Sequence, residues 1–338
     1  MTAASVNLFV VRTPLQLFNA TEARDRLHAG EHNALLMQYG SPVDRELMEG
    51  LLDDGWQVVR RYAFTGLRRR FYAWLLAPWL RQLGRPQVLY IGLITHLPLH
   101  VANFCAPQTL RLLDDGNETL LIARRLAELR HSSPKRRRWL ERLFAQRLDT
   151  GVLASIKAFS IYNTEPLGLP RLANDYRMFR QRVSDLPVRR CTVFIGSNLV
   201  GNYFKGEAEF LQVLSKVRER WQGELIYCPH RYESQQLRDR IRALGFELLL
   251  PDTILEHAFM RAGWRPEGLA TFRSTAVDTL GRIYGLPGVM IEMPLDSIIA
   301  DKQNELELVW EAFQASGGRV LMTSDTTPWS LFDTDPLS

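Results

Sequence analysis

The chain has 338 residues and a formal net charge of +5, with 46% hydrophobic and 23% charged residues. This length and balance suit a globular enzyme of two domains and exclude an intrinsically disordered chain. The longest apolar run, residues 71–80, contains a proline and is too short to span a bilayer. The first dozen residues lack the pattern of a secretory signal. Three widely spaced cysteines argue against a disulfide framework or a zinc site, so we expect a cytoplasmic protein.

The N-terminal half alternates between apolar runs typical of buried strands and amphipathic runs typical of helices. Strands are predicted at residues 6–11, 33–38, 56–59, 88–92, 109–113 and 158–162, and helices at 14–28, 41–52, 60–85 and 96–103. Thr13 and Pro14 have the residue types that cap and begin a helix. A strand followed by a capped helix is the first unit of a Rossmann-like sheet.

A second series of the same kind follows a polar stretch, residues 174–187, which is predicted to be a linker. Strands are predicted at residues 191–196, 224–227, 246–250, 269–272 and 288–293, the last closing the sheet, and helices at 206–221, 234–244, 254–262 and up to about 285. Two successive α/β halves predict two facing Rossmann-like domains with a cleft between them, over residues 1–185 and 186–338.

Two adjacent carboxylates and a glycine, Asp114, Asp115 and Gly116, come directly after the strand predicted at 109–113. The end of a buried strand is where α/β proteins bind ligands, and a carboxylate there can act as a general base. Because adjacent strand residues point to opposite faces, only one aspartate is expected to face the ligand, and the turn at Gly116 favours Asp115. Alternatively, an aspartate caps the following helix, a role that Asn117 can also fill.

Residues 53–55 form a second Asp-Asp-Gly sequence, at the end of the helix predicted over residues 41–52. A glycine at such a position is typical of a helix C-terminal stop. We therefore interpret this second copy as structural.

Pro229, His230 and Arg231 leave the strand predicted at 224–227 together. An imidazole and a guanidinium both suit an anion, and His230 could protonate or hydrogen-bond a departing phosphate oxygen. The alternative is a structural histidine. Ser274 and Thr275 begin a helix, so hydroxyls, backbone N–H groups and the helix dipole can converge on a phosphate. Their alternative role is that of ordinary helix caps.

The segment between residues 124 and 147 carries nine Lys or Arg residues against two Glu. Apolar residues recur at helical spacing within it, at Trp139, Leu140, Leu143 and Phe144. The pattern predicts a basic amphipathic helix near residues 135–147 that contacts an anionic membrane surface or glycan. A solvated helix packed by its apolar stripe is the alternative. Nucleic acid is not expected, because no nucleic-acid module accompanies the charge.

Taken together, residues 11–17, the Asp114–Gly116 turn, Pro229-His230 and Ser274-Thr275 resemble bacterial sialyltransferases of the lipooligosaccharide sialyltransferase and polysialyltransferase type, glycosyltransferase family 52. These enzymes share an acidic-acidic-glycine motif, a His-Pro motif and a Ser-Ser/Thr motif in that order. The resemblance extends from about residue 6 to about residue 295. One departure is that Pro229 precedes His230 here.

The resemblance implies a GT-B fold and inverting, metal-independent transfer from a CMP-activated nonulosonic acid to a hydroxyl of a surface glycan, such as lipopolysaccharide or capsule. The sugar could be sialic acid or a relative such as pseudaminic or legionaminic acid. Asp115 or Asp114 is then the base, His230 assists loss of CMP, and Ser274 and Thr275 hold its phosphate. The other residues expected to contact the donor are Gly116, Ser197, Asn198, Pro229 and Arg231, and those expected on the acceptor side are Arg12, Thr13, Gln16, Asn163 and Glu165.

No cofactor or metal is expected, because no cluster of His, Cys or carboxylate residues has metal-ligand spacing. Two alternatives stay open. The chain could use another nucleotide sugar, such as CMP-Kdo or a UDP or GDP sugar, on the same scaffold. It could also be a non-catalytic protein that binds glycans or membranes.

Overall fold

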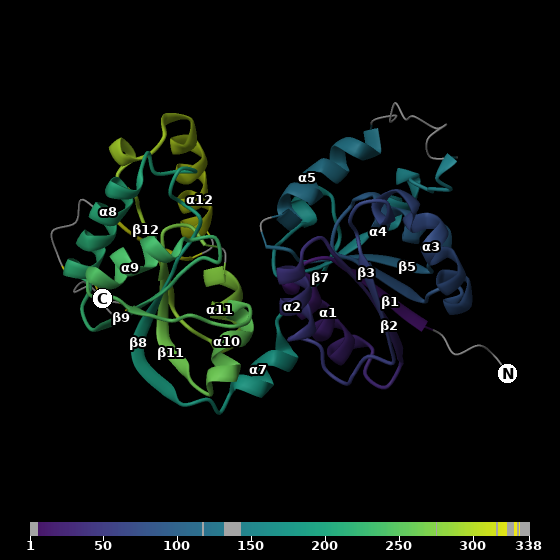
Figure 1. Cartoon of the computed structure of the whole chain (residues 1–338), viewed down its shortest axis with the longest axis horizontal. Helices are drawn as coiled ribbons and strands as arrows, with labels where there is room; N and C mark the ends of the chain where they lie inside the picture. The colour runs from purple at the N-terminus through teal and green to yellow at the C-terminus, as the bar shows by residue number, and fades with distance from the viewer. Residues whose placement is uncertain are drawn as a thin grey trace. The chain divides into compact units, whose positions relative to one another are not determined.

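The computed structural model describes residues 6–116, 118–131, 143–274, 276–315, 317–322, 328, 329 and 331. The chain divides into two compact units, Met1–Phe179 and Arg180–Ser338, called here the first and second unit (Figure 1). The sequence placed this division between residues 185 and 186. Asn117, Thr275 and residues 132–142, which include most of the basic helix predicted near residues 135–147, lie outside the described residues.

The described part of the first unit forms a seven-stranded parallel sheet in the order β3-β2-β1-β4-β5-β6-β7 (Figure 1). Its strands are β1 (Val6–Val11), β2 (His32–Tyr39), β3 (Val58–Ala63), β4 (Val88–Ile91), β5 (Thr109–Leu113), β6 (Lys157–Ser160) and β7 (Arg171–Ala173). The helices are α1 (Pro14–Leu27), α2 (Pro42–Glu49), α3 (Arg68–Leu83), α4 (His96–Cys105) and α5 (Glu118–His131), with short 3-10 helices η1 (Thr150–Ser155) and η2 (Glu165–Leu167).

The apolar residues of β1 explain why this strand lies inside the sheet. These five residues and Asn7 are all buried, as expected for a parallel sheet with helices on both faces. Leu8 and Val10 belong to a core that includes residues of α3 and α4, whereas Phe9 and Val11 belong to a second core that includes residues of α1. The alternation of side chains along β1 therefore divides the core of the first unit between the two faces of the sheet.

The described part of the second unit forms a six-stranded parallel sheet in the order β10-β9-β8-β11-β12-β13. Its strands are β8 (Val188–Ile195), β9 (Glu224–Cys228), β10 (Glu247–Leu248), β11 (Arg265–Thr271), β12 (Gly288–Ile291) and β13 (Arg319–Leu321). The helices are α7 (Arg177–Val183), which begins in the first unit, α8 (Glu207–Arg220), α9 (Gln235–Ala243), α10 (Leu255–Ala262), α11 (Ala276–Tyr284) and α12 (Gln303–Ala315), with 3-10 helices η3 (Leu295–Ser297) and η4 (Ala300–Lys302).

Each sheet has one point where the order of the strands reverses direction. In the first sheet this point lies between β1 and β4, and in the second it lies between β8 and β11. Open α/β sheets bind ligands just beyond the carboxyl ends of the strands at such points. The predicted α/β class with two Rossmann-like domains is confirmed, and these two edges are where a site is expected.

Several predicted elements were wrong. Residues 60–63, predicted as helix, belong to the edge strand β3, where exposed arginines are tolerated. The predicted linker is ordered instead: Asn174 is buried, and Phe179 of α7 stacks on Phe18 of α1 at 3.8 Å between ring centroids. Finally, β13 rather than β12 is the edge strand of the second sheet.

The second Asp-Asp-Gly sequence has a structural role, although not the predicted one. The helix before it already ends at Glu49, with Gly50 as its cap. Asp53 forms a bidentate ion pair with Arg24 of α1. A Cβ on Gly55 would lie 2.4 Å from the guanidinium carbon of Arg24, so the glycine permits this close approach.

Over the described ranges, no helix has the length and apolar character needed to cross a membrane. Within the same ranges, no three His, Cys, Asp or Glu side chains lie close enough together to hold a metal ion. Cys105, Cys191 and Cys228 are buried free thiols.

Candidate functional site

The carboxylate of Asp115 lies just beyond β5, and residues that follow β1 bind both of its oxygens. The Thr13 hydroxyl donates to Oδ1 over 2.7 Å, and Nε2 of Gln16 donates to Oδ2 over 2.8 Å. Since β4 lies between β1 and β5, these bonds cross the point where the strand order reverses. The carboxylate is thus oriented by the scaffold of the sheet and not only by its own turn.

The start of α1 holds the two donors in place. The Thr13 hydroxyl caps α1 by accepting the Gln16 N–H over 3.1 Å. The Arg12 N–H donates to Oε1 of Gln16 over 2.8 Å, and Nε2 of Gln16 also donates to the Gly92 carbonyl over 3.3 Å. A Cβ on Gly92 would lie 2.0 Å from Oε1 of Gln16. The residue directly after β4 must therefore be glycine for Gln16 to reach Asp115.

Burial raises the pKa of Asp115, whereas the hydrogen bonds from Thr13 and Gln16 act in the opposite direction. The side chain is only partly buried. A carboxylate with a raised pKa is a stronger base than an exposed one and is better matched to proton transfer near neutral pH. Asp115 has the exposure and the basicity that a general base requires.

Asp114 is in a different environment. It is 2% exposed, its Oδ2 accepts the Ile161 N–H over 2.6 Å, and its carbonyl accepts Nδ2 of Asn19 over 3.1 Å. Burial raises its pKa to about 7. These contacts join β5 to the end of β6 and to α1, so we interpret Asp114 as a residue that stabilises the fold. This contrast favours Asp115 as the base.

The other residues predicted for the first unit lie at the same edge of its sheet. Gly116 adopts a φ of 65°, the left-handed conformation that a turn after Asp115 requires. Asn163 and Glu165 are exposed on the loop after β6, where the Glu165 N–H donates to Oδ1 of Asn163 over 3.4 Å. The structure therefore brings Arg12, Thr13 and Gln16 to Asp115 and places Asn163 and Glu165 on a neighbouring loop.

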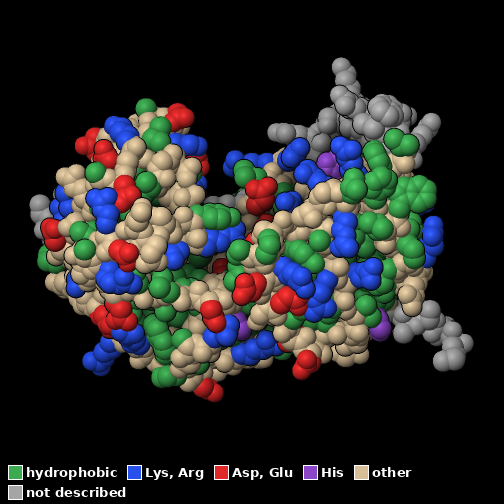
Figure 2. Space-filling model, in the orientation of Figure 1, with side chains coloured by type: hydrophobic (Ala, Val, Ile, Leu, Met, Phe, Trp, Pro, Cys, Tyr) green, Lys and Arg blue, Asp and Glu red, His purple; other side chains and the backbone are tan. Residues whose placement is uncertain are grey.

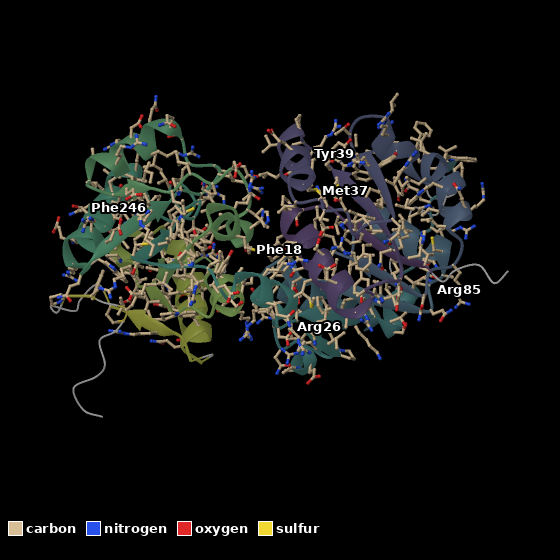
Figure 3. All side chains as sticks on the ribbon, turned by 90° about the horizontal axis from the view of Figure 1, so that it is seen from below. Phe18, Arg26, Met37, Tyr39, Arg85 and Phe246 are labelled. Carbon is tan, nitrogen blue, oxygen red and sulfur yellow. The ribbon has the colours of Figure 1, made fainter. Side chains whose placement is uncertain are left out.

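A cavity of about 470 Å³ opens at the carboxyl ends of β2 and β3. Its lining includes Tyr39, Ser41, Arg45, Glu46 and Thr65. Tyr39 is the last residue of β2, next to β1 in the sheet (Figure 3). The cavity is large enough for a small ligand and was not predicted, because its lining comes from α2 and the ends of β2 and β3 without a motif.

In the second unit, His230 lies in the loop after β9. It is partly buried, and its Nδ1 accepts the Tyr232 N–H over 3.3 Å. Burial and the neighbouring Arg231 guanidinium lower the pKa of His230. The ring is therefore neutral near pH 7, with its proton on Nε2, where it can donate a hydrogen bond. Pro229 precedes it, and Arg231 is exposed with its guanidinium 4.9 Å from the ring centroid of Tyr232.

Glu233 holds this loop and was not among the predicted residues. Its Oε1 accepts the Tyr227 hydroxyl over 2.9 Å and the His230 N–H over 3.1 Å. A Cβ on Gly196, after β8, would lie 2.7 Å from the same oxygen. Burial raises the pKa of Glu233 to about 7. A glutamate one residue before a helix cap resembles a surface residue, so the sequence carries no signal for this role.

Ser274 lies between β11 and α11, close to the end of β8. Its N–H donates to the Thr271 hydroxyl over 3.0 Å, and that hydroxyl donates to the Ile195 carbonyl over 2.9 Å. The Ser274 hydroxyl accepts the Ala276 N–H over 3.3 Å in the first turn of α11. Its predicted partner, Thr275, lies outside the described residues.

Ser197 and Asn198 lie in the loop after β8, where their backbone carbonyls accept hydrogen bonds within that loop. Arg273, next to Ser274, was missed. Its guanidinium lies 4.3 Å from the ring centroid of Tyr203 and bonds to Glu305 over 2.8 Å. The Tyr203 hydroxyl and Lys302 also bond to Glu305, over 2.6 and 3.1 Å. Two cations thus share one carboxylate beside the start of α11, an arrangement that suits an anion.

Three solved structures resemble the chain over almost its whole length. The GT-B domain of a sialyltransferase from Photobacterium damselae is 12% identical and has a TM-score of 0.51, over 94% of this chain and 99% of that one. The 2,6-sialyltransferase of Photobacterium sp. JT-ISH-224, in complex with CMP and lactose, is 12% identical with a TM-score of 0.51, over 96% and 79%. UGT2 of Phytolacca americana, with UDP-2fluoro-glucose and pterostilbene, is 11% identical with a TM-score of 0.50, over 95% and 86%.

No protein-family model matches the chain, and no curated protein matches its sequence. At 11–12% identity the three structures show the fold alone. The chain therefore has the two-domain GT-B fold of glycosyltransferases.

Proposed function

We propose that the chain is an inverting glycosyltransferase that moves a nonulosonic acid from a CMP-activated donor to a hydroxyl of a glycan. The observation that carries this proposal is the Asp115 carboxylate, fixed by Thr13 and Gln16 where the strand order reverses. The GT-B fold and the resemblance of the motif order to sialyltransferases support it. The acceptor is assigned to the first unit and the donor to the second.

On the acceptor side, Asp115 takes the proton of the attacking hydroxyl as the new C–O bond forms at the anomeric carbon. The bond from this carbon to the CMP oxygen breaks, and its electron pair leaves with the phosphate. Attack on the face opposite CMP inverts the configuration. Further sugars of the acceptor can occupy the cavity at the ends of β2 and β3, which adjoins β1 in the sheet order.

On the donor side, the leaving phosphate gains negative charge as the bond breaks. The Ser274 hydroxyl, the first N–H groups of α11 and the Arg273 guanidinium can stabilise that charge. His230 can donate a hydrogen bond from Nε2 to the departing oxygen. Because these groups suffice to stabilise a phosphate, we propose that transfer needs no metal, and turnover in EDTA should equal turnover without it.

A thermal-shift panel of CMP, UDP and GDP tests the donor. Stabilisation by CMP alone supports the proposal, and stabilisation by UDP or GDP alone overturns the CMP assignment. Ser274→Ala should weaken the CMP shift, whereas Ser215→Ala in α8, whose hydroxyl donates to Glu219, is the matched control.

Incubation with authentic CMP-sugars then tests catalysis. Release of CMP that increases when an acceptor glycan is added supports a transferase. Binding of CMP without any release would indicate a non-catalytic glycan-binding protein.

A further inference from the structure

Helix α3 is apolar on two opposite faces. Tyr72, Leu76 and Leu80 are buried and pack in the core of the first unit. The other face exposes large apolar side chains, whose exposed fractions are 41% for Phe71, 58% for Trp74 and 49% for Leu75. Leu67, directly before the helix, is 72% exposed. The spacing of these four residues, i, i+4, i+7 and i+8, places them on one side of the helix.

This exposed face continues beyond α3. The ring of Phe144 meets that of Phe71 edge-on, with 5.5 Å between centroids, and Leu143 is 60% exposed. Gln146 bonds to the carbonyl of Arg70 over 3.2 Å, which holds this segment against the helix. The α3 apolar patch is defined here as Leu67, Phe71, Trp74, Leu75 and Leu143. Five large apolar side chains that are all at least two-fifths exposed are more than the scattered single residues of an ordinary surface.

The charged residues in the stretch of sequence that contains α3 are all of one sign. The sequence from residue 55 to residue 113 contains eight arginines and no Asp or Glu. Arg68, Arg69, Arg70 and Arg81 are exposed on α3, and Arg85 is exposed directly after it (Figure 3). Figure 2 shows blue and green side chains together over the part of the first unit where Figure 1 places α3. The α3 apolar patch is therefore bordered by arginines.

We propose that this face binds the surface of an anionic phospholipid bilayer. The aromatic and aliphatic side chains would enter the interfacial region, and the arginines would contact lipid phosphates. Arginine has an apolar stem that can lie along the same interface while its charge stays in the headgroup layer.

Two other partners fit this face less well. Nucleic acid is bound by arginines that contact phosphates, but it offers nothing to cover protruding leucines. A second copy of the same face would bring two sets of arginines together, and like charges across an interface are unfavourable. An anionic bilayer is complementary to both the charge and the apolar side chains.

The position of α3 leaves the candidate site of the first unit open. Side chains of α3 and of α1 belong to different cores, on opposite faces of the sheet. Thr13, which orients Asp115, caps α1. Docking through α3 therefore does not cover the residues that orient Asp115, and the inference does not depend on the identity of the donor.

Co-sedimentation of the full chain with vesicles tests the proposal, using phosphatidylcholine alone and an equal mixture of phosphatidylcholine and phosphatidylglycerol. Only the mixed vesicles should retain the protein. Raising the salt from about 0.1 M to about 1 M shortens the Debye length from about 10 Å to about 3 Å and should weaken the binding. Equal binding to both vesicle types would overturn the proposal.

The double variant Trp74→Ser/Leu75→Ser should bind the mixed vesicles about tenfold more weakly, because two half-exposed side chains no longer enter the interface. Leu250→Ser, 53% exposed in the second unit, is the matched control and should bind like the wild type. Both variants should keep the wild-type melting temperature, since the side chains are exposed. Retained binding by the double variant overturns the proposal. So does a change in its oligomeric state by light scattering without a change in vesicle binding, which would indicate self-association.

A spectroscopic measurement locates the contact. Brominated acyl chains quench tryptophans that enter the bilayer, and the chain has eight tryptophans. Trp74→Phe should sediment with the vesicles as the wild type does, yet lose most of the quenching. Unchanged quenching in this variant would place the membrane contact elsewhere and overturn the assignment to α3. Release of CMP from a donor in vesicle-free solution should be the same in all these variants.

Discussion

The Thr13 hydroxyl donates a 2.7 Å hydrogen bond to Oδ1 of Asp115, 102 positions further along the chain. The same hydroxyl accepts the Gln16 N–H and so caps α1. The hydroxyl therefore accepts a hydrogen bond from the helix and donates one to the carboxylate. A substitution at Thr13 is therefore expected to alter both the cap of α1 and the position of the Asp115 carboxylate.

Asp115→Asn should lower the rate of transfer by about 10²–10⁴, because an amide cannot take the proton of the acceptor. Its oxygen can accept from Thr13 or from Gln16, but not from both, so a modest loss of about 1 kcal/mol in stability is expected. CMP binding should be unchanged in a thermal-shift assay. Near-wild-type turnover in this variant would assign the base to another residue.

Thr13→Val should change the pH dependence of transfer. The hydrogen bond from Thr13 lowers the pKa of Asp115, which burial raises, so its removal should raise that pKa further. Since the base must be ionised, the acidic limb of the pH–rate profile should move to higher pH, with activity recovering as the pH rises. Thr13→Ser keeps the hydroxyl and should keep the wild-type profile. An unmoved limb in the valine variant would contradict this role.

Gly92→Ala tests the packing that positions Gln16. The added Cβ would lie 2.0 Å from Oε1 of Gln16, so the side chain must leave Asp115. We expect a destabilisation of about 1–3 kcal/mol together with loss of activity. In the double variant Gly92→Ala/Gln16→Ala the clash is gone, and stability should largely return while activity does not. Additive losses of stability in this double-mutant cycle would show that the two residues are independent.

The order of strands and helices was predictable because apolar runs and helix caps are local signals. Thr13 and Pro14 mark the start of α1, and the largely apolar β1 marks a central strand. The edge strand β3 was not predictable in full. Two of its six residues are exposed arginines. The pattern of apolar and polar residues in the sequence cannot distinguish such arginines from those on the surface of a helix.

The site was predictable as residue types but not as contacts. The sequence indicated Thr13, Gln16 and Asp115 separately, but their contact depends on β4 lying between β1 and β5, and strand order is a long-range property. Glu233 and Arg273 were missed as well. Neither belongs to a motif: Glu233 acts through the backbone of its own loop, and Arg273 acts through Tyr203 on another loop.

His230→Ala should lower the release of CMP by about 10²–10³, the effect of losing one well-placed hydrogen-bond donor to a developing anion. Because burial and Arg231 lower the pKa of His230, the neutral ring is the form that donates at neutral pH. The rate in the wild type should therefore hold as the pH rises above about 6.5, the ordinary value from which this pKa is lowered. A rate that falls as the pH rises through the pKa of His230, in the wild type but not in the alanine variant, would contradict this. It would indicate that the protonated, cationic ring of His230 is the form that acts.

The buried Asp114 should make the folded state less stable as the pH rises. Its pKa is about 7 in the folded chain, against an ordinary value of 3.8, because burial disfavours the charged form. Between these two values the unfolded chain has lost this proton while the folded chain retains it. Stability is then highest below the unfolded pKa and declines up to the folded pKa, by an amount of the order of a few kcal/mol.

Asp114→Asn isolates this contribution. The amide stays neutral at every pH, and its oxygen can still accept the Ile161 N–H. Denaturant unfolding at several pH values between about 4 and about 8 should therefore show a smaller decline in the variant than in the wild type. Glu233→Gln is the comparison in the second unit, because burial raises the pKa of Glu233 to about 7 as well. If the asparagine variant declined as steeply as the wild type, Asp114 would be ionised in the folded chain, and its burial would have to be compensated by partners other than Ile161.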